Sequence, residues 1–215
     1  MHINGLGKAK IENMKKQGNE KMNYVKNILA IYAQADQFEM AHGLNWYSDA
    51  KAAAFEIADK YEMPLSIVVG VIAALSPTNK WERNLVDAEN LIECFINGGY
   101  MEDINVCTYK TMKEKAWNIM LENNPLVDHI AKLLNGPKIT DFFWCILGHD
   151  VCVIDGHAWC IANADRRTLQ EVPNIGKKLR QELQAAYVAA GASQGITAYE
   201  MQAITWVAWK RIYNV

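Results

Sequence analysis

The sequence predicts an all-α protein, and three observations lead to that prediction. Apolar residues recur at steps of three and four over most of the chain, which is the spacing of one face of a helix. No segment alternates apolar and polar residues over the length that a half-buried strand needs. Pairs such as Met63-Pro64 and Gly136-Pro137 interrupt the periodic segments at points where helices begin.

Composition limits the size of the core and the kind of partner. The 215 residues are 51% hydrophobic, enough for one substantial core or for two small lobes that share one. A net charge of -2 argues against broad binding to polyanions, so any contact with DNA must come from a local patch. No apolar run approaches the roughly 18 residues of a membrane span, and the N-terminus lacks a signal-peptide pattern. We therefore expect a cytoplasmic protein without a membrane partner.

The cysteines show no sign of a metal site. They fall mostly in apolar runs, without a paired C-x-x-C spacing and without the four-cysteine spacing C-x6-C-x2-C-x5-C of an iron–sulfur site. We expect reduced core thiols, and neither a metal nor another cofactor. The residues are Cys94, Cys107, Cys145, Cys152 and Cys160.

The first quarter of the chain predicts an arm followed by two helices. Residues 1–21 are polar and rich in glycine, asparagine and lysine, as in a flexible basic arm. Residues 22–41 carry an apolar stripe that predicts an amphipathic helix. His42-Gly43 is expected to break it, and a second helix follows with Ser48 as its cap.

The middle of the chain predicts four further helices. Residues 64–75 are apolar nearly all round, which is typical of a helix at the centre of a core. Residues 81–96 have an apolar stripe on one face, and shorter helical patterns cover residues 108–121 and 125–134.

The most informative stretch is residues 135–165, because it places an amine and a carboxylate at two helix starts. Lys138 follows a Gly-Pro turn at the mouth of an apolar helix. Asp155 stands in the N-cap position of the next helix, where its carboxylate can accept backbone N–H groups. A primary amine paired with a carboxylate suits nucleophilic chemistry at a sugar carbon.

These residues resemble the helix-hairpin-helix DNA glycosylases, and within them the 8-oxoguanine DNA glycosylase branch. That family has a lysine after the hairpin turn and a catalytic aspartate in a segment V-D-x-H-x-W. Lys138 and the segment from Ile154 to Trp159 match it in order and nearly in spacing. The resemblance implies that Lys138 is a nucleophile, that Asp155 stabilises the transition state, and that Gly136 and His157 contact DNA.

The same resemblance implies a helical bundle of two lobes with a cleft between them. The lobes are expected at about residues 65–165 and at residues 22–64 plus 166–215. The hairpin LLNGPK is shorter than the family's L-P-G-V-G-x-K, and VPNIGKKLRQEL is a rival hairpin. No aspartate follows the rival hairpin at the needed distance, so Lys177 is expected only to bind a phosphate.

Two further segments resemble the same family. Gln202 and Trp206 reproduce the spacing of the Q-A-x-x-F pattern of its last helix, with tryptophan in place of phenylalanine; in that pattern an amide reads the base edge and a ring stacks on the base. Trp46 or Tyr47 is an alternative source of the ring. Taken alone, Trp206 is more typical of a helical core than of a binding platform, and its place downstream of Lys138 and Asp155 favours the binding role.

The loop before residue 81 matches the place where the family inserts a side chain beside an extruded base. Thr78 and Asn79 are the candidates, with Arg83 reaching the opposite strand or a phosphate. A plain helix cap at Thr78 or Asn79 explains the loop equally well.

The resulting prediction is a monomeric DNA glycosylase with abasic-site lyase activity, acting on double-stranded DNA that carries a damaged or modified base. Such a protein is expected in the cytoplasm, with nucleoid or viral DNA. Two alternatives remain open. The first is a virus-type enzyme of the same fold that hypermodifies a DNA base. The second is a non-catalytic module that binds DNA.

Overall fold

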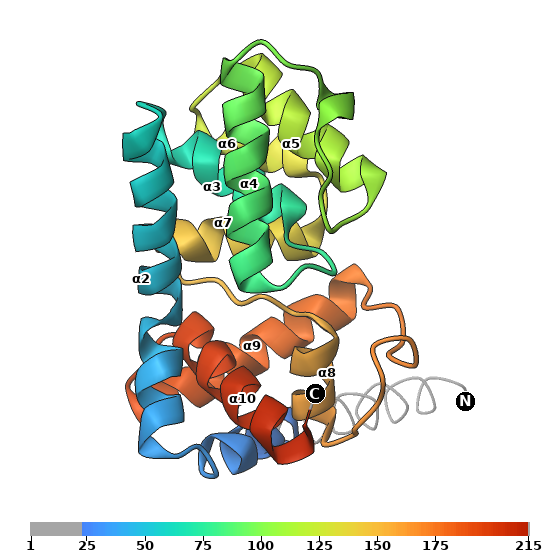
Figure 1. The fold of residues 1–215 in the computed structure, drawn as a ribbon. Helices are drawn as coiled ribbons and strands as arrows, with labels where there is room; N and C mark the ends of the chain where they lie inside the picture. Colours follow the sequence, from blue (N-terminus) through green and yellow to red (C-terminus); the bar gives the residue numbers. More distant parts are fainter. Residues whose placement is uncertain (1–22, 215) are drawn as a thin grey trace, which may run out of the picture. The chain divides into compact units, whose positions relative to one another are not determined.

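A computed structural model describes residues 23–214, and within them the regular structure is helical, without a strand (Figure 1). The all-α prediction is therefore confirmed for this part of the chain, whereas the predicted basic arm lies outside the described residues. Residues 23–32 are helical. The labelled helices are α2 (Gln37–Lys60), α3 (Leu65–Leu75), α4 (Trp81–Ile96), η1 (Met101–Asp103), α5 (Lys110–Glu122), α6 (Val127–Leu134), α7 (Pro137–Leu147), α8 (Gly156–Asn163), α9 (Lys177–Gln194) and α10 (Ala198–Tyr213).

The chain divides into two compact units. Unit 2 is Tyr47–Asp150, and unit 1 takes the described residues before and after it. The boundary at Asp150 comes earlier than the end of the lobe expected at about 65–165, because α8 packs with α9 and α10. Asp155 therefore belongs to unit 1.

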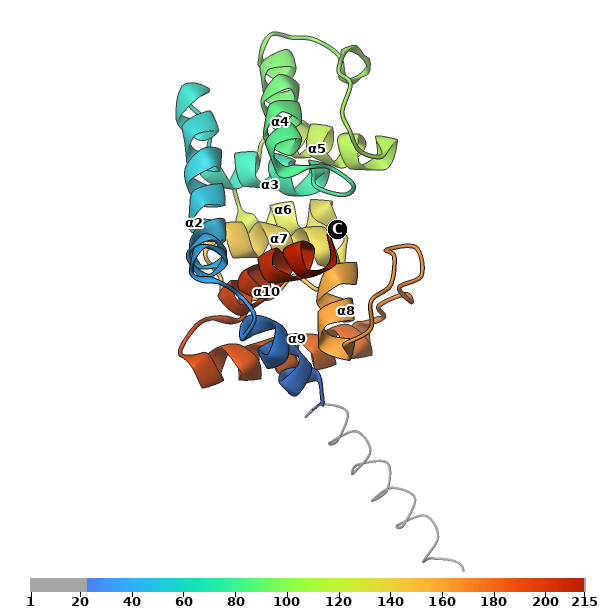
Figure 2. The ribbon, with the colours of Figure 1, turned by 60° about the horizontal axis from the view of Figure 1, so that its bottom comes forward.

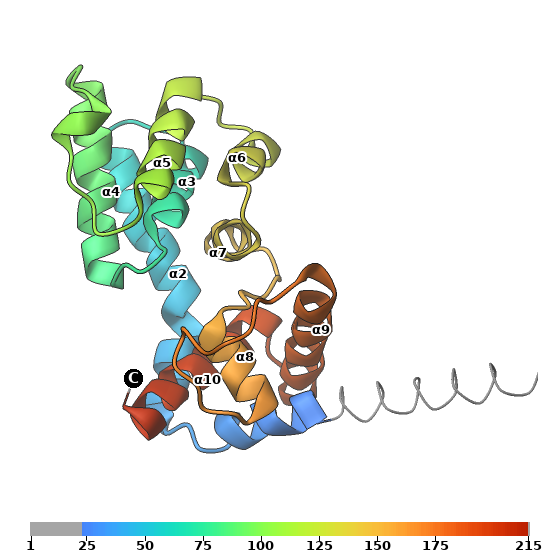
Figure 3. The ribbon, with the colours of Figure 1, turned by 90° about the vertical axis from the view of Figure 1, so that its right-hand side faces the viewer.

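Unit 2 is built around α3, as the apolar sequence of that helix predicts. Residues 67–75 are all buried, and α4, α5, α6 and α7 pack against α3 (Figure 3). At Gly70 a Cβ atom would lie 2.6 Å from Cγ2 of Ile130, so this glycine lets α6 pack closely on α3. The hydrophobic helix thus serves as the axis of this unit.

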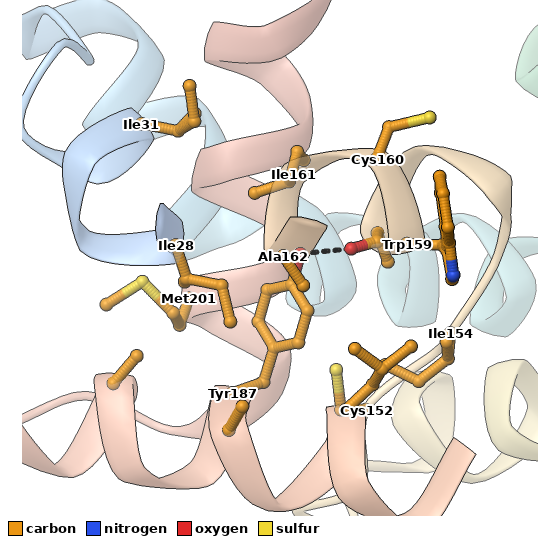
Figure 4. Packing of buried hydrophobic residues seen from close by; sticks show 14 of the residues in the cluster. Ile28, Ile31, Cys152, Ile154, Trp159, Cys160, Ile161, Ala162, Tyr187 and Met201 are labelled. Atoms are coloured by element: carbon orange, nitrogen blue, oxygen red, sulfur yellow. Dashed lines mark hydrogen bonds between the residues drawn. The ribbon is translucent and has the colours of Figure 1, made fainter. Parts of the chain in front are cut away.

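The core of unit 1 is formed by α8, α9, α10 and the helix over residues 23–32 (Figure 2). Tyr187 of α9 is fully buried at its centre, beside Ile28 and Met201 (Figure 4). Its hydroxyl donates to the Ala158 carbonyl oxygen at 3.3 Å, and burial raises the pKa of this phenol well above its usual value.

The predicted break at His42-Gly43 is wrong, because α2 runs through it from Gln37 to Lys60. The actual break is at residues 33–36, and Asp36 caps the new helix by accepting from the Phe38 and Glu39 N–H groups at 2.9 Å. Ser48 consequently lies inside a helix and is not a cap.

Gly43 is needed for helix packing rather than for a turn. A Cβ atom on Gly43 would lie 2.5 Å from Cα of Ile204 on α10, so only glycine lets these two helices approach this closely.

Most other boundaries follow the sequence. Helix α4 ends at the C-cap Asn97, and Pro137 occupies the first turn of α7 behind the N-cap Gly136. Among the cysteines, Cys145, Cys152 and Cys160 are buried, as expected of core thiols. Cys107 is exposed, because it lies in the loop before α5, so it is not the core thiol predicted.

Candidate functional site

Asp155 is held at one oxygen only. It is the N-cap residue of α8, and its Oδ1 accepts the Ala158 N–H at 2.9 Å, which confirms the predicted cap. The residue is half-buried. Within residues 23–214 no hydrogen bond or ion pair engages Oδ2, so a single hydrogen bond orients the carboxylate.

The segment that leads to Asp155 is supported by α9, which the sequence did not reveal. Arg180 donates from Nη1 to the Ile154 carbonyl oxygen at 3.0 Å, and Gln184 donates from Nε2 to the Cys152 carbonyl oxygen at 3.0 Å. The one sequence pattern that links these two polar residues is their i, i+4 spacing, which places both side chains on the same face of α9.

Gln202 and Trp206 lie in unit 1, on α10, which packs against α8. Gln202 is 6% exposed and is therefore a buried amide rather than a surface residue. Trp206 is half-buried, and its ring meets the Trp46 ring edge-on with centroids 6.2 Å apart. The Lys210 ammonium lies 3.5 Å from the Trp206 centroid, so a cation covers one face of this indole.

The remaining predicted residues of unit 1 are near the starts of its helices. His157 is half-buried in the first turn of α8. Beside it, a Cβ atom on Gly156 would lie 2.6 Å from Cδ2 of Leu169, which places the loop before α9 against the start of α8. Lys177 is the exposed first residue of α9, behind the N-cap Gly176.

Lys138 and Gly136 belong to unit 2. Lys138 is exposed in the first turn of α7. The turn before it is closed by a lysine that no sequence pattern indicates. Lys115 of α5 donates to the Leu134 carbonyl oxygen and, at 3.3 Å, to the Asn135 carbonyl oxygen.

The loop before α4 is organised by a buried carboxylate, Asp87. Its oxygens accept from Arg83 Nε at 2.6 Å, from Asn79 Nδ2 at 2.9 Å and from the Cys107 N–H at 2.8 Å. The positive charge of Arg83 is thus tied to a carboxylate that is fully buried, and this contact raises the pKa of Arg83.

Thr78 lies at the exposed tip of this loop with a left-handed backbone, φ 60°. Asn79 Nδ2 donates to the Leu75 carbonyl oxygen at the end of α3 at 3.4 Å, but the N-cap residue of α4 is Lys80, so neither Thr78 nor Asn79 caps the start of α4. Instead Asn79 ties the loop to Asp87, and Thr78 is held in a conformation that is uncommon for a β-branched residue.

A family model described as "Family of unknown function (DUF7178)" matches residues 10–212. The chain belongs to this family. The DUF7178 match spans both units, so the family is defined by them together. A search of curated proteins and a search of solved structures each found no match.

Within residues 23–214, no group of three or more His, Cys, Asp and Glu side chains is arranged to hold a metal ion. Among the described helices, none combines the length and the hydropathy that a membrane crossing requires.

Proposed function

We propose that this protein is a DNA glycosylase with strand-nicking activity, which extrudes a damaged or modified base and excises it. The observation that carries the proposal is the Asp155 carboxylate, half-buried and fixed at one oxygen, in the same unit as the Gln202 and Trp206 helix. The resemblance of these residues to helix-hairpin-helix glycosylases supplies the reaction.

Asp155 has the properties of a carboxylate that can assist the cleavage of a glycosidic bond. When the bond from the sugar C1′ to the base breaks, the electron pair leaves with the base and positive charge develops on the sugar. A negative charge that is already oriented and partly desolvated stabilises this transition state without reorganising. The Ala158 N–H orients the carboxylate, and half-burial desolvates it in part.

Gln202 and Trp206 are proposed to read the extruded base. A four-residue step places them on one face of α10, so an amide and an indole can address the same flat ring. Stacking on an aromatic residue stabilises an extruded base by about 1–3 kcal/mol, comparable to the cost of extrusion. A base that stacks on the face covered by Lys210 must first displace that ammonium.

Lys138 is proposed to form the covalent intermediate. Its amine, once deprotonated, bonds to C1′ as the base departs, and loss of a proton and ring opening give a Schiff base. Elimination then breaks the bond from C3′ to the phosphate oxygen and nicks the strand. Lys138 is exposed, so a DNA strand can reach it.

The test is a panel of duplexes that each carry one modified base, beginning with 8-oxoguanine. Free base is measured by mass spectrometry, and the covalent intermediate is trapped with borohydride. We expect Asp155→Asn to lower base release at least about 100-fold. Lys138→Gln is expected to abolish trapping. The matched controls are Asp128→Asn and Lys132→Gln, which alter exposed residues of α6 and are expected to retain both activities.

Other results separate the alternatives. Efficient trapping by Lys138→Gln would refute the lysine assignment while leaving base excision intact. A nucleoside of increased mass without free base would favour base hypermodification. If no duplex yields a product and Asp155→Asn leaves DNA affinity unchanged, the non-catalytic DNA-binding module is the better description.

A further inference from the structure

Three donors on one face of α9 bond to three backbone carbonyl oxygens around Asp155. Arg180, Gln184 and Tyr187 follow each other at steps of four and three, so they share a helix face. Arg180 bonds to the Ile154 carbonyl oxygen at 3.0 Å, and Gln184 bonds to that of Cys152 at 3.0 Å. Tyr187 bonds to the Ala158 carbonyl oxygen at 3.3 Å. Two of these contacts precede Asp155 and one follows it.

The segment before Asp155 needs such partners. Cys152, Val153 and Ile154 are buried, yet residues 151–155 lie outside any helix and have no strand beside them within the described chain. A buried carbonyl without a partner is costly, so these groups must be paired by side chains. In an extended segment, carbonyls two residues apart point to the same side, which explains why Cys152 and Ile154 both face α9.

The third contact is made to the residue whose N–H orients the carboxylate. Ala158 donates its N–H to Asp155 Oδ1 and offers its carbonyl to the Tyr187 hydroxyl. The aspartate is thereby fixed from both sides, through Ile154 on the peptide before it and through Ala158 one turn later.

We infer that Arg180, Gln184 and Tyr187 are positioning residues that set the Asp155 carboxylate for catalysis. The inference rests on the proposed function, since it assigns a purpose to this geometry. A purely structural role predicts that losing a contact lowers global stability alone. A positioning role predicts a specific change at the Asp155 cap and in turnover.

The experiment compares full-length variants that differ only in these donors. Gln184→Met and Arg180→Met remove a donor while keeping side-chain length, and Arg180→Lys keeps a donor. Gln181→Met is the matched control, because Gln181 is an exposed glutamine on the same helix. The first measurement is the amide hydrogen-exchange rate of Ala158, referred to that of Ile72 in the core of unit 2. The second is kcat and KM of base release on the duplex that the panel identifies.

We expect Gln184→Met and Arg180→Met to raise the Ala158 exchange rate about tenfold relative to Ile72. The same variants should lower kcat by about tenfold or more while KM stays within about twofold, because misplacing a catalytic group affects the transition state rather than substrate binding. Arg180→Lys is expected to recover most of both losses, and Gln181→Met is expected to match the wild type.

Equal exchange at Ala158 in Gln184→Met, Arg180→Met and the control would overturn the inference. So would a fall in kcat that only follows the fraction of unfolded protein. If the wild type releases no base from any duplex, the proposed function fails by itself. The exchange rates then still decide whether α9 holds Asp155 in place.

Discussion

Gly43→Ala tests whether α2 and α10 pack as closely as the structure indicates. In an exposed helix, replacing glycine by alanine stabilises by about 1 kcal/mol, because alanine has the better helix propensity. At Gly43 the new methyl group would lie 2.5 Å from Cα and Cγ1 and 2.6 Å from the backbone N of Ile204. Two of these three atoms are backbone atoms, so a side-chain rotation cannot relieve the contact.

Overpacking of this kind costs about 1–3 kcal/mol, and more when backbone must move. An ordinary contact of a methyl group has a distance of about 3.4–4 Å, so the two helices must separate by about 1 Å. The cost of overpacking is therefore at the upper end, about 3 kcal/mol. After subtracting the gain in propensity, we expect the free energy of unfolding to fall by about 2 kcal/mol. For a chain of this size, that lowers Tm by about 4–8 °C.

The assay is urea and thermal unfolding, followed by circular dichroism. The matched control is the reverse substitution at an exposed position of the same helix, Ala41→Gly, which is expected to cost about 1 kcal/mol. Alanine is thus the better residue at position 41 and the worse one at position 43. A Gly43→Ala protein as stable as the wild type, or more stable, would refute the close packing of α2 on α10.

Three further outcomes are expected. Asp87→Asn should lower the free energy of unfolding by about 2–3 kcal/mol, measured in urea, since it replaces a buried carboxylate that accepts three bonds; a loss equal to that of the exposed Asp128→Asn would contradict this. Arg211 bonds to Glu39 and lowers the pKa of its carboxyl. The wild type should therefore have a higher free energy of unfolding than Glu39→Gln, and this difference should be complete at neutral pH. It should shrink as the pH falls below about 4.3, the pKa of a glutamate in the unfolded chain. A difference that stays constant down to pH 3 would count against the Glu39–Arg211 pair. Thr78→Gly should relieve the strain of the left-handed backbone and leave Tm unchanged or slightly higher. If the loop tip enters duplex DNA, the same variant should bind the duplex more weakly. An unchanged affinity would show that Thr78 does not contact the DNA.

Features set by neighbouring residues could be predicted from the sequence. The cap at Asp155 depends only on a carboxylate three residues before an N–H, and it is present as expected. The apolar sequence of α3 likewise predicts a helix buried on all sides. In both cases the physical cause lies within one turn of the chain.

Features set by distant contacts could not be predicted in this way. Gly43 suggests a helix break, because the sequence does not show that Ile204 lies against it. The contacts of Arg180 with Ile154 and of Lys115 with Leu134 join segments that are separated along the chain, and no sequence pattern shows which carbonyl each side chain bonds. The burial of Asp87 could have been predicted, because this charged residue stands beside Ala88 in the stripe of α4 that faces the core.

The division of the chain into two units has a consequence for folding during synthesis. Unit 2 is one continuous stretch, Tyr47–Asp150, so its contacts can form as soon as that stretch has left the ribosome. Unit 1 is discontinuous, because the helix over residues 23–32 packs with α8, α9 and α10. Its core must wait for α10, which follows the other helices of this unit in the sequence. The nascent chain therefore exposes the apolar face around Ile28 until Met201 is made, and this interval is where chaperones are expected to bind.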